Sequence, residues 1–136
     1  MLRKLEAHGV VGDLLQWMTD WTRSRSQRVV LNGTSSSWAD VLSSVVQGSV
    51  LGPVLFIIFI NDIDFVVDGK ETKIFKYADD SKFGRRIRSD YDSAILQSHL
   101  DGVVQWAATN GMTLHPQKLI VVHFGYSNPG HLYTLS

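Results

Sequence analysis

Apolar residues recur at helical spacing through the first part of the chain. Their positions are Leu2, Leu5, Val10, Leu14, Trp17 and Trp21. Gly9 and Gly12 interrupt this pattern, and because glycine disfavours helix interiors we expect two helices in succession. Asp13 is a candidate N-cap for the second helix, which should end near Arg23.

Two strand-like runs follow. They are Gln27–Leu31 and Trp38–Leu42, and residues 32–37 connect them. The connection begins with Asn32-Gly33, a pair that adopts positive φ readily and is typical of tight turns. The pattern therefore predicts a hairpin.

The most apolar segment of the chain is Val54–Ile60. Its seven residues are far fewer than the ~20 that a membrane-spanning helix needs. Pro53 suits a first helical position, so we expect a helix from there to about Ile63. The segment is apolar almost all round, which predicts burial on most sides. Asp68-Gly69 then predicts a turn.

The second half of the chain predicts a short hairpin with acidic residues at its tip. Lys73–Tyr77 and Ser81–Phe83 are the predicted strands, and Ala78-Asp79-Asp80 connects them.

A long helix should follow this hairpin. Ser89 with Asp92 three residues later forms a capping-box pattern at its start, and Asn110-Gly111 is a good C-terminal cap. The apolar positions on one face of this helix are Ile95, Leu96, Leu100, Val103, Trp106 and Ala107. Leu119–Phe124 is predicted to be a further strand.

Composition narrows the class of protein. A length of 136 residues fits one domain or a part of one, and 44% hydrophobic residues provide enough apolar material for a core. Thirteen basic residues balance thirteen acidic ones, so any attraction to a polyanion must be local. The absence of cysteine excludes disulfides, thiolate zinc sites and cysteine nucleophiles.

Asp79 and Asp80 are the strongest candidates for chemistry. Adjacent carboxylates at a turn are costly to ionise together unless a cation neutralises them, and Mg²⁺ typically takes one or two carboxylates together with phosphate oxygens. The alternative is an ordinary polar turn, which is the commoner role of an Asp-Asp pair. The region from residue 70 to 88 holds seven cations against three acids, which should attract phosphates. The cations are Lys70, Lys73, Lys76, Lys82, Arg85, Arg86 and Arg88.

Gln47-Gly48 is a second candidate site. Glycine lets backbone amides approach a ligand closely, and the N-terminus of the following helix favours phosphate. An ordinary loop-to-helix turn explains the same residues. The five histidines lack metal-ligand spacing, and no motif for nucleophilic catalysis occurs.

The order of segments resembles the reverse transcriptase of LINE-type, non-LTR retrotransposons. The resemblance runs through the whole chain. It is carried by the hairpin at residues 25–33, by residues 47–56 together with Ile60-Asn61-Asp62, and by Tyr77-Ala78-Asp79-Asp80, which is similar to the catalytic box of the family. Later similarities are Trp106, Asn110-Gly111-Met112, Pro116, Lys118, His123-Phe124-Gly125, Asn128-Pro129 and Tyr133-Thr134-Leu135.

The resemblance implies an α+β fold: a partial right-hand polymerase palm in which a small antiparallel sheet bears the acidic hairpin and is backed by helices. It implies RNA-directed DNA synthesis with two Mg²⁺ ions, an RNA template, a DNA primer and deoxynucleoside triphosphates. Asp79 and Asp80 would be catalytic metal ligands. The other implied roles are nucleotide and template contact by Gln47 and Gly48, primer and nucleotide contact by Tyr77 and Ala78, and leaving-phosphate contact by Lys118. The alternatives are core packing for Tyr77 and a solvated strand edge for Lys118.

Some features depart from the family pattern. In the family another aspartate, on a strand just before the helix that begins near Leu2, completes the metal site, and fingers and thumb segments flank the palm. We therefore expect residues 1–136 to be a partial reverse transcriptase domain that has little activity alone. Val46, His115 and Leu119 stand where proline, asparagine and cysteine are common.

Two alternatives remain open beside the polymerase. The chain could be a retroelement remnant that acts as a nucleic-acid-binding or interaction module, or an inactive fragment with open strand edges. The missing polymerase segments would be partners in a longer chain. With no secretory signal or membrane span expected, the family implies the nucleus or cytoplasm.

Overall fold

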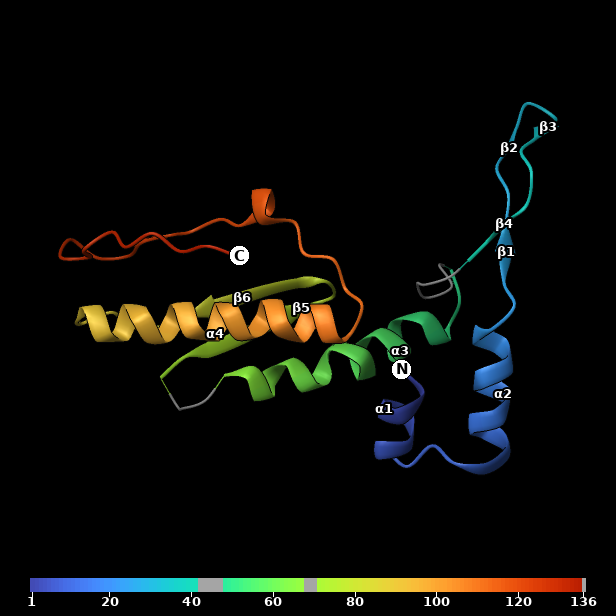
Figure 1. Cartoon of the computed structure of the whole chain (residues 1–136), viewed down its shortest axis with the longest axis horizontal. Helices are drawn as coiled ribbons and strands as arrows, with labels where there is room; N and C mark the ends of the chain where they lie inside the picture. Colours follow the sequence, from blue (N-terminus) through green and yellow to red (C-terminus); the bar gives the residue numbers. More distant parts are fainter. Residues whose placement is uncertain (42–47, 68–70, 136) are drawn as a thin grey trace. The chain divides into compact units, whose positions relative to one another are not determined.

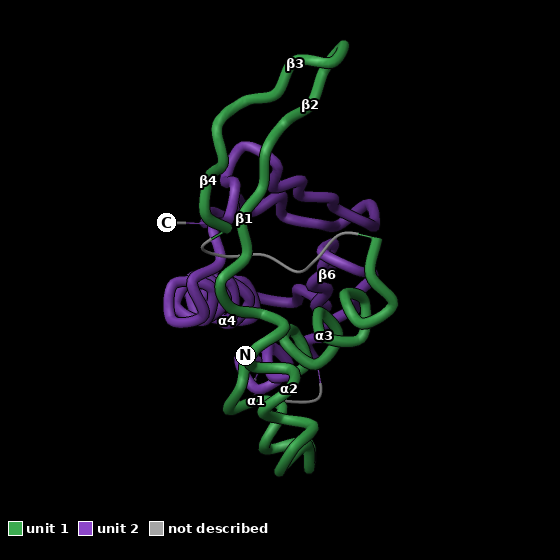
Figure 2. The backbone as a smooth tube through the Cα atoms, turned by 90° about the vertical axis from the view of Figure 1, so that its right-hand side faces the viewer, with its two compact units in different colours: residues 1–61 green, residues 62–136 purple. Residues whose placement is uncertain are grey.

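The computed structural model describes residues 1–41, 48–67 and 71–135. These residues divide into two compact units, Met1–Asn61 and Asp62–Ser136 (Figure 2). The predicted turn at Asp68-Gly69 lies outside the described residues. Helices are mixed with short antiparallel strand pairs, as expected for the α+β class.

Unit 1 contains the two predicted N-terminal helices, α1 (Leu2–Ala7) and α2 (Gly12–Thr22) (Figure 1). The chain turns between them at Gly9, whose φ is +84°. The N-cap of α2 is Val11, so the prediction of Asp13 as a cap is wrong. Asp13 lies instead in the first turn of α2, where its negative charge interacts favourably with the positive end of the helix dipole.

The core of unit 1 joins α1, α2 and α3 (Leu51–Ile60). Leu5, Met18 and Leu55 are its buried members. The half-buried side chains around them are Leu2, Val10, Leu15, Trp21, Leu51 and Ile58. Lys4 also fixes α1 to α3, because its Nζ donates a 2.7 Å hydrogen bond to the carbonyl oxygen of Phe59 and lies 4.6 Å from the centre of the Phe59 ring.

The predicted hairpin is confirmed, but its strands are shorter than predicted and pair in two separate stretches. Leu42, the last residue of the predicted second strand, lies outside the described residues. β1 (Ser26–Gln27) pairs with β4 (Ala39–Asp40), and β2 (Val30–Leu31) pairs with β3 (Thr34–Ser35). The predicted six-residue connection is wrong: the turn consists of Asn32 and Gly33, with φ of +49° and +79°. Two successive positive φ angles match the twist of a two-residue hairpin turn, which lets pairing continue up to the turn.

α3 begins two residues before the predicted start at Pro53. The hydroxyl of Ser49 accepts a 3.0 Å hydrogen bond from the backbone N–H of Gly52, and this bond holds the first turn. α3 continues directly into a 3₁₀ helix, η1 (Asn61–Val66). Burial on most sides is also wrong, because Val54 and Ile57 are 51% and 64% exposed.

Unit 2 consists of the acidic hairpin and a long helix. β5 (Lys73–Tyr77) and β6 (Asp80–Gly84) form the predicted antiparallel pair. The prediction that Asp80 lies in the connection is wrong, because Asp80 pairs with Tyr77 as the first residue of β6. α4 (Asp90–Thr109) has the predicted caps. At its start Ser89 Oγ accepts from the backbone N–H of Asp92 at 3.4 Å, and at its end the chain leaves through Asn110 and Gly111, the latter with φ of +67°.

The chain after α4 is irregular apart from a short 3₁₀ helix, η2 (Pro116–Lys118). The predicted strand at Leu119–Phe124 is wrong, because these residues pair with no strand among those the structure describes. An apolar run forms a strand only where a neighbouring strand takes up its backbone hydrogen bonds. Tyr133 returns to α4, where its hydroxyl lies 3.2 Å from that of Ser93.

Candidate functional site

The acidic residues lie at the closed end of the β5–β6 hairpin. Tyr77 and Asp80 are the last cross-strand pair, and Ala78 and Asp79 form the two-residue turn between them. Ala78 has φ of +51° while Asp79 does not have positive φ. Alanine rarely adopts this left-handed region, so the turn holds local backbone strain of a kind that clusters at functional sites.

Both carboxylates face solvent. Asp79 and Asp80 are exposed, and neither side chain forms a hydrogen bond or ion pair with the rest of the described chain. The predicted geometry, a sharp bend that exposes two neighbouring acids, is confirmed. Their role as catalytic metal ligands stays a prediction.

Aromatic and cationic side chains share the exposed face of the hairpin with Asp80. Alternate residues of each strand are exposed, which places Phe75 opposite Lys82 and Tyr77 opposite Asp80 on this face. Tyr77 is 85% exposed and Phe75 is 64% exposed. The alternative that Tyr77 packs in a core beside Phe75 is therefore wrong.

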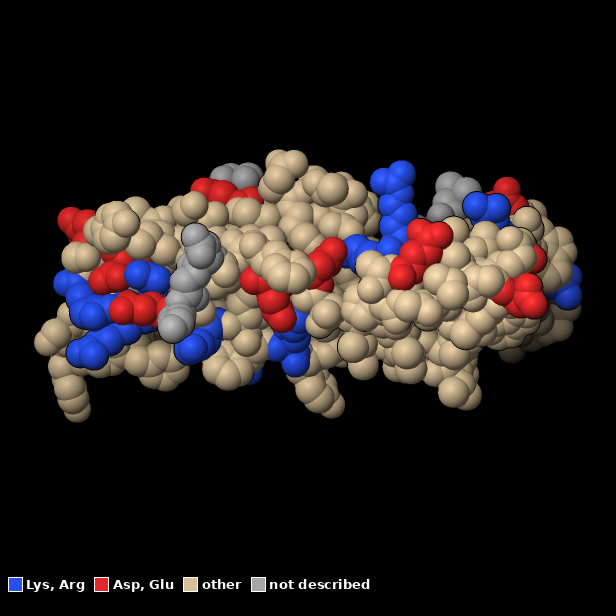
Figure 3. Space-filling model, turned by 90° about the horizontal axis from the view of Figure 1, so that it is seen from below, with Lys and Arg blue, Asp and Glu red and all other residues tan. Residues whose placement is uncertain are grey.

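The local excess of positive charge is smaller than the sequence suggested. Lys76 pairs with Asp64 at 2.8 Å, Arg85 pairs with Asp92 at 2.8 Å, and Arg88 pairs with Glu71. Basic and acidic side chains are accordingly interspersed on the face drawn in Figure 3. The cations that form no ion pair among the described residues are Lys73, Lys82 and Arg86, whereas Lys70 lies outside those residues.

A buried polar network lies at the open end of the hairpin. Arg85 donates one hydrogen bond to the hydroxyl of Thr72 at 3.2 Å and another to Asp92 at 2.8 Å. His99 Nδ1 lies 3.1 Å from the same Thr72 hydroxyl. This network is absent from the sequence-based predictions because Thr72 and His99 are far apart in the chain. The spacing of seven residues between Asp92 and His99, which places both on one face of a helix, was the available signal.

These contacts shift the acid–base equilibria of the groups around them. The hydrogen bond from Arg85, helped by the backbone N–H of Arg88 at 3.1 Å, holds the pKa of Asp92 below its ordinary value. The hydrogen bond from Arg88 lowers the pKa of Glu71, and the same contact raises the pKa of Arg88. Each shift favours the charged form, so the ion pairs persist at neutral pH.

The other predicted site residues are not part of the hairpin. Gly48, in unit 1, is exposed and has φ of +78°, which only glycine adopts readily. Gln47 lies outside the described residues. Lys118 is exposed at the end of η2, so its alternative assignment to a strand edge is wrong.

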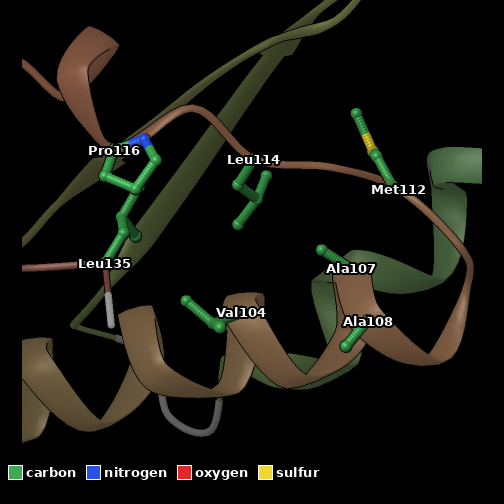
Figure 4. Close-up of a pocket in the computed structure, with 7 residues that line it drawn as sticks. All are labelled: Val104, Ala107, Ala108, Met112, Leu114, Pro116 and Leu135. Carbon is green, nitrogen blue, oxygen red and sulfur yellow. The ribbon is translucent and has the colours of Figure 1, made fainter.

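Unit 2 also has an apolar pocket of about 200 Å³ (Figure 4). Its lining residues are Val104, Ala107, Ala108, Met112, Leu114, Pro116 and Leu135. None of the predicted catalytic or nucleotide-binding residues lines it, and it has no charged group that would orient a nucleotide.

The acidic turn suits a hard divalent ion. Across the described parts of the chain no group of three or more His, Cys, Asp or Glu side chains is placed to hold a metal. Asp79 and Asp80 are two adjacent carboxylates. Mg²⁺ is usually bound by one or two protein carboxylates, and water and substrate phosphates complete its octahedral coordination. The donor set of Asp79 and Asp80 fits this ion, whereas a closed structural zinc site needs four protein ligands.

Comparison with known proteins identifies the class. Residues 1–131 match the family model described as reverse transcriptase (RNA-dependent DNA polymerase), so the chain belongs to the reverse transcriptase family, as its resemblance implied. Its similarity to the polymerase of a mobile element agrees with the predicted LINE-type, non-LTR origin. No solved structure matches the chain significantly.

One relative is the RNA-directed DNA polymerase from mobile element jockey of Drosophila melanogaster. The two are 32% identical over 106 residues, which cover 74% of this chain and 12% of the relative. The chain therefore spans a small part of the length of the curated relative it matches. No helix in the described residues is long and apolar enough to cross a bilayer.

Proposed function

We propose that this chain is part of the palm of an RNA-directed DNA polymerase, and that Asp79 and Asp80 hold Mg²⁺ at its catalytic centre. The observation that supports this most directly is a pair of adjacent, exposed carboxylates at a strained turn in a chain of the reverse transcriptase family. The substrates would be an RNA template, a DNA primer and deoxynucleoside triphosphates.

Divalent ions held by Asp79 and Asp80 would supply activation of the primer 3′ hydroxyl and stabilisation of the charge on the triphosphate. The role of Asp79 and Asp80 is to hold these ions at a fixed place. Tyr77 presents an exposed ring beside Asp80, and the small side chain of Ala78 leaves the turn open to a primer end or an incoming nucleotide. Lys73 and Lys82 lie on the same exposed face and would attract phosphates.

The more distant roles rest on the resemblance. Gln47 and Gly48 would contact nucleotide and template, and Lys118 would contact the leaving phosphate. The positive φ of Gly48 favours close approach of backbone to a ligand, and the exposure of Lys118 leaves its ammonium accessible.

Metal binding by the two aspartates is tested with Mn²⁺ as a paramagnetic probe in NMR spectra of the 136-residue chain. Low Mn²⁺ should broaden the amide signals of residues 77–80 first. Asp79→Asn and Asp80→Asn should each weaken binding at least tenfold, because each removes one of two carboxylate ligands. Asp13→Asn is the matched control, since Asp13 is an exposed aspartate in unit 1. Equal broadening in the wild type and in both hairpin variants would contradict the proposed site.

Polymerase activity is tested separately by primer extension with Mg²⁺, an RNA template and a DNA primer. We expect little or no synthesis by residues 1–136 alone, because the match covers only 12% of the related polymerase and catalytic groups that act as a unit lose several orders of magnitude in rate when they are separated. Template-dependent synthesis at rates typical of polymerases would contradict this expectation.

A nucleic-acid-binding module without turnover is the second candidate. The exposed rings of Phe75 and Tyr77 share one face of the hairpin with Lys73 and Lys82, which favours this function because such a face can stack on bases and contact phosphates. Binding to an RNA–DNA duplex that weakens with salt, and that Asp79→Asn and Asp80→Asn leave unchanged in EDTA, would support this function.

A further inference from the structure

The buried polar network joins the two strands of the hairpin at their open end. Lys73 is the first residue of β5 and Gly84 is the last residue of β6. They form the cross-strand pair farthest from the acidic turn. Thr72 and Arg85 come directly beyond this pair on the two strands. The guanidinium of Arg85 donates to the Thr72 hydroxyl at 3.2 Å, which extends the pairing by a side-chain bond after the backbone ladder ends.

The same two residues attach both strands to α4. Arg85 also donates to Oδ1 of Asp92 at 2.8 Å, in the first turn of α4. The Thr72 hydroxyl accepts from Arg85, so its own proton is available for Nδ1 of His99, 3.1 Å away and two helical turns further along. Each strand end is therefore bound to a different point of one helix face.

The four side chains are withdrawn from water. Thr72, Asp92 and His99 are 4%, 7% and 7% exposed, and the side chain of Arg85 is 8% exposed. Polar contacts in such surroundings are strong when satisfied and costly when broken, so they define one geometry rather than several. An isolated two-stranded hairpin is marginally stable in water, so it needs an attachment of this kind to keep a fixed direction.

A second contact holds β5 near its far end, one residue before Tyr77. Lys76 forms a 2.8 Å ion pair with Asp64 of η1, and Asp62 of η1 accepts a 3.0 Å hydrogen bond from the indole N–H of Trp106 on α4. Both attachments thus end on α4, whereas the acidic turn projects beyond them.

From this arrangement we propose that Thr72, Arg85, Asp92 and His99 are positioning residues for the Asp79-Asp80 turn. The inference rests on the proposed function, because it concerns the same carboxylates. Five strand residues at ~3.4 Å each place the turn ~17 Å from the network, so a tilt of ~10° at the network moves the carboxylates by ~3 Å. Metal and substrate sites tolerate displacements of only ~0.5 Å.

The decisive substitution is Thr72→Val, which keeps the shape of the side chain and removes the hydroxyl that links Arg85 to His99. Thr72→Ser keeps the hydroxyl and should restore the wild-type behaviour. Thr19→Val is the matched control, because Thr19 is also buried and also loses one hydroxyl bond, to the carbonyl of Leu15 in unit 1.

Two readouts on the full chain separate positioning from general stability. Hydrogen exchange of the amides in β5 and β6 should become about tenfold faster in Thr72→Val and should not change in Thr19→Val. Mn²⁺ affinity, measured by broadening of residues 77–80, should fall severalfold in Thr72→Val only, because a hairpin with several directions spends less time in the binding geometry. Thr72→Ser should bind Mn²⁺ as the wild type does.

Unchanged exchange and unchanged Mn²⁺ affinity in Thr72→Val would overturn the proposal, as would faster exchange without any loss of affinity. If circular dichroism shows that Thr72→Val does not fold, Asp92→Asn is the variant to test instead, because asparagine keeps one acceptor oxygen. Asp92→Asn should make hydrogen exchange faster and Mn²⁺ affinity lower, each by a smaller factor than Thr72→Val. An unchanged value of either would overturn the proposal. If the wild type shows no Mn²⁺ effect at residues 77–80, the metal site and its positioning both fail. The exchange comparison then shows only whether the network orders the hairpin.

Discussion

Where α4 contacts η1, one interatomic distance decides whether a substitution raises or lowers the free energy of unfolding. Gly102 lies inside α4, where glycine is less favourable than alanine by ~1 kcal/mol. A Cβ atom placed on Gly102 would lie 2.6 Å from Cγ1 of Val66 in η1. Carbon atoms pack at ~3.5 to 4.0 Å, so the added methyl group needs ~1 Å that the structure does not provide.

The substitution Gly102→Ala therefore combines two opposing terms. Helix propensity favours alanine by ~1 kcal/mol, whereas overpacking costs ~1 to 3 kcal/mol. Val66 relieves the clash poorly, because its side chain is β-branched and its carbonyl oxygen already lies 3.8 Å from the new Cβ position. We expect a net loss of ~1 kcal/mol in the free energy of unfolding.

The assay is urea unfolding followed by circular dichroism, for Gly102→Ala in the wild type and in the Val66→Ala background. Removing Cγ1 of Val66 removes the obstacle, so the same substitution should then stabilise the chain by up to ~1 kcal/mol. The reversal of sign between the two backgrounds is the diagnostic result. Stabilisation by Gly102→Ala in both backgrounds would show that η1 does not pack on α4 at this distance.

Further predictions concern acid sensitivity, the acidic turn and the core. The hydrogen bond from Arg85 makes the pKa of Asp92 lower in the folded state than in the unfolded state. The pair therefore contributes its full stabilisation above pH ~4, and this stabilisation is lost as the pH falls through the folded-state pKa. Asp92→Asn should flatten this loss in urea titrations at pH 7 to 3, and an equally steep loss in the variant would contradict the assignment. Ala78→Gly should stabilise the hairpin by ~0.5 to 1 kcal/mol, as measured by native-state hydrogen exchange. Glycine at positive φ avoids a strain of ~1 to 2 kcal/mol, although it loses more chain entropy on folding than alanine does. Slower exchange in the alanine form than in the glycine form would refute this reasoning. Leu55→Ala should lower the free energy of unfolding by ~2 to 5 kcal/mol, since Leu55 is 1% exposed. Val54→Ala on the exposed side of the same helix should cost less than ~0.5 kcal/mol, and similar losses for the two would mean that α3 is covered on both sides.

Local features of the structure could be predicted from the sequence because their causes lie within a few residues. Asn32-Gly33 turns the first hairpin through its preference for positive φ, and Ser89 caps α4 through a backbone N–H three residues away. The exposure of Asp79-Asp80 follows in the same way from two short strands that meet at a two-residue turn. The order of these local signals was also sufficient to indicate the family.

The tertiary structure decided what depends on contacts between distant residues. The strand expected at Leu119–Phe124 is absent because backbone pairing needs a partner strand that no local pattern provides. The apolar segment at Val54–Ile60 predicted a helix correctly, but only packing determines which of its sides are covered. Likewise, Thr72 and His99 meet across 27 residues of sequence, so only the folded chain places their hydrogen bond at the base of the acidic hairpin.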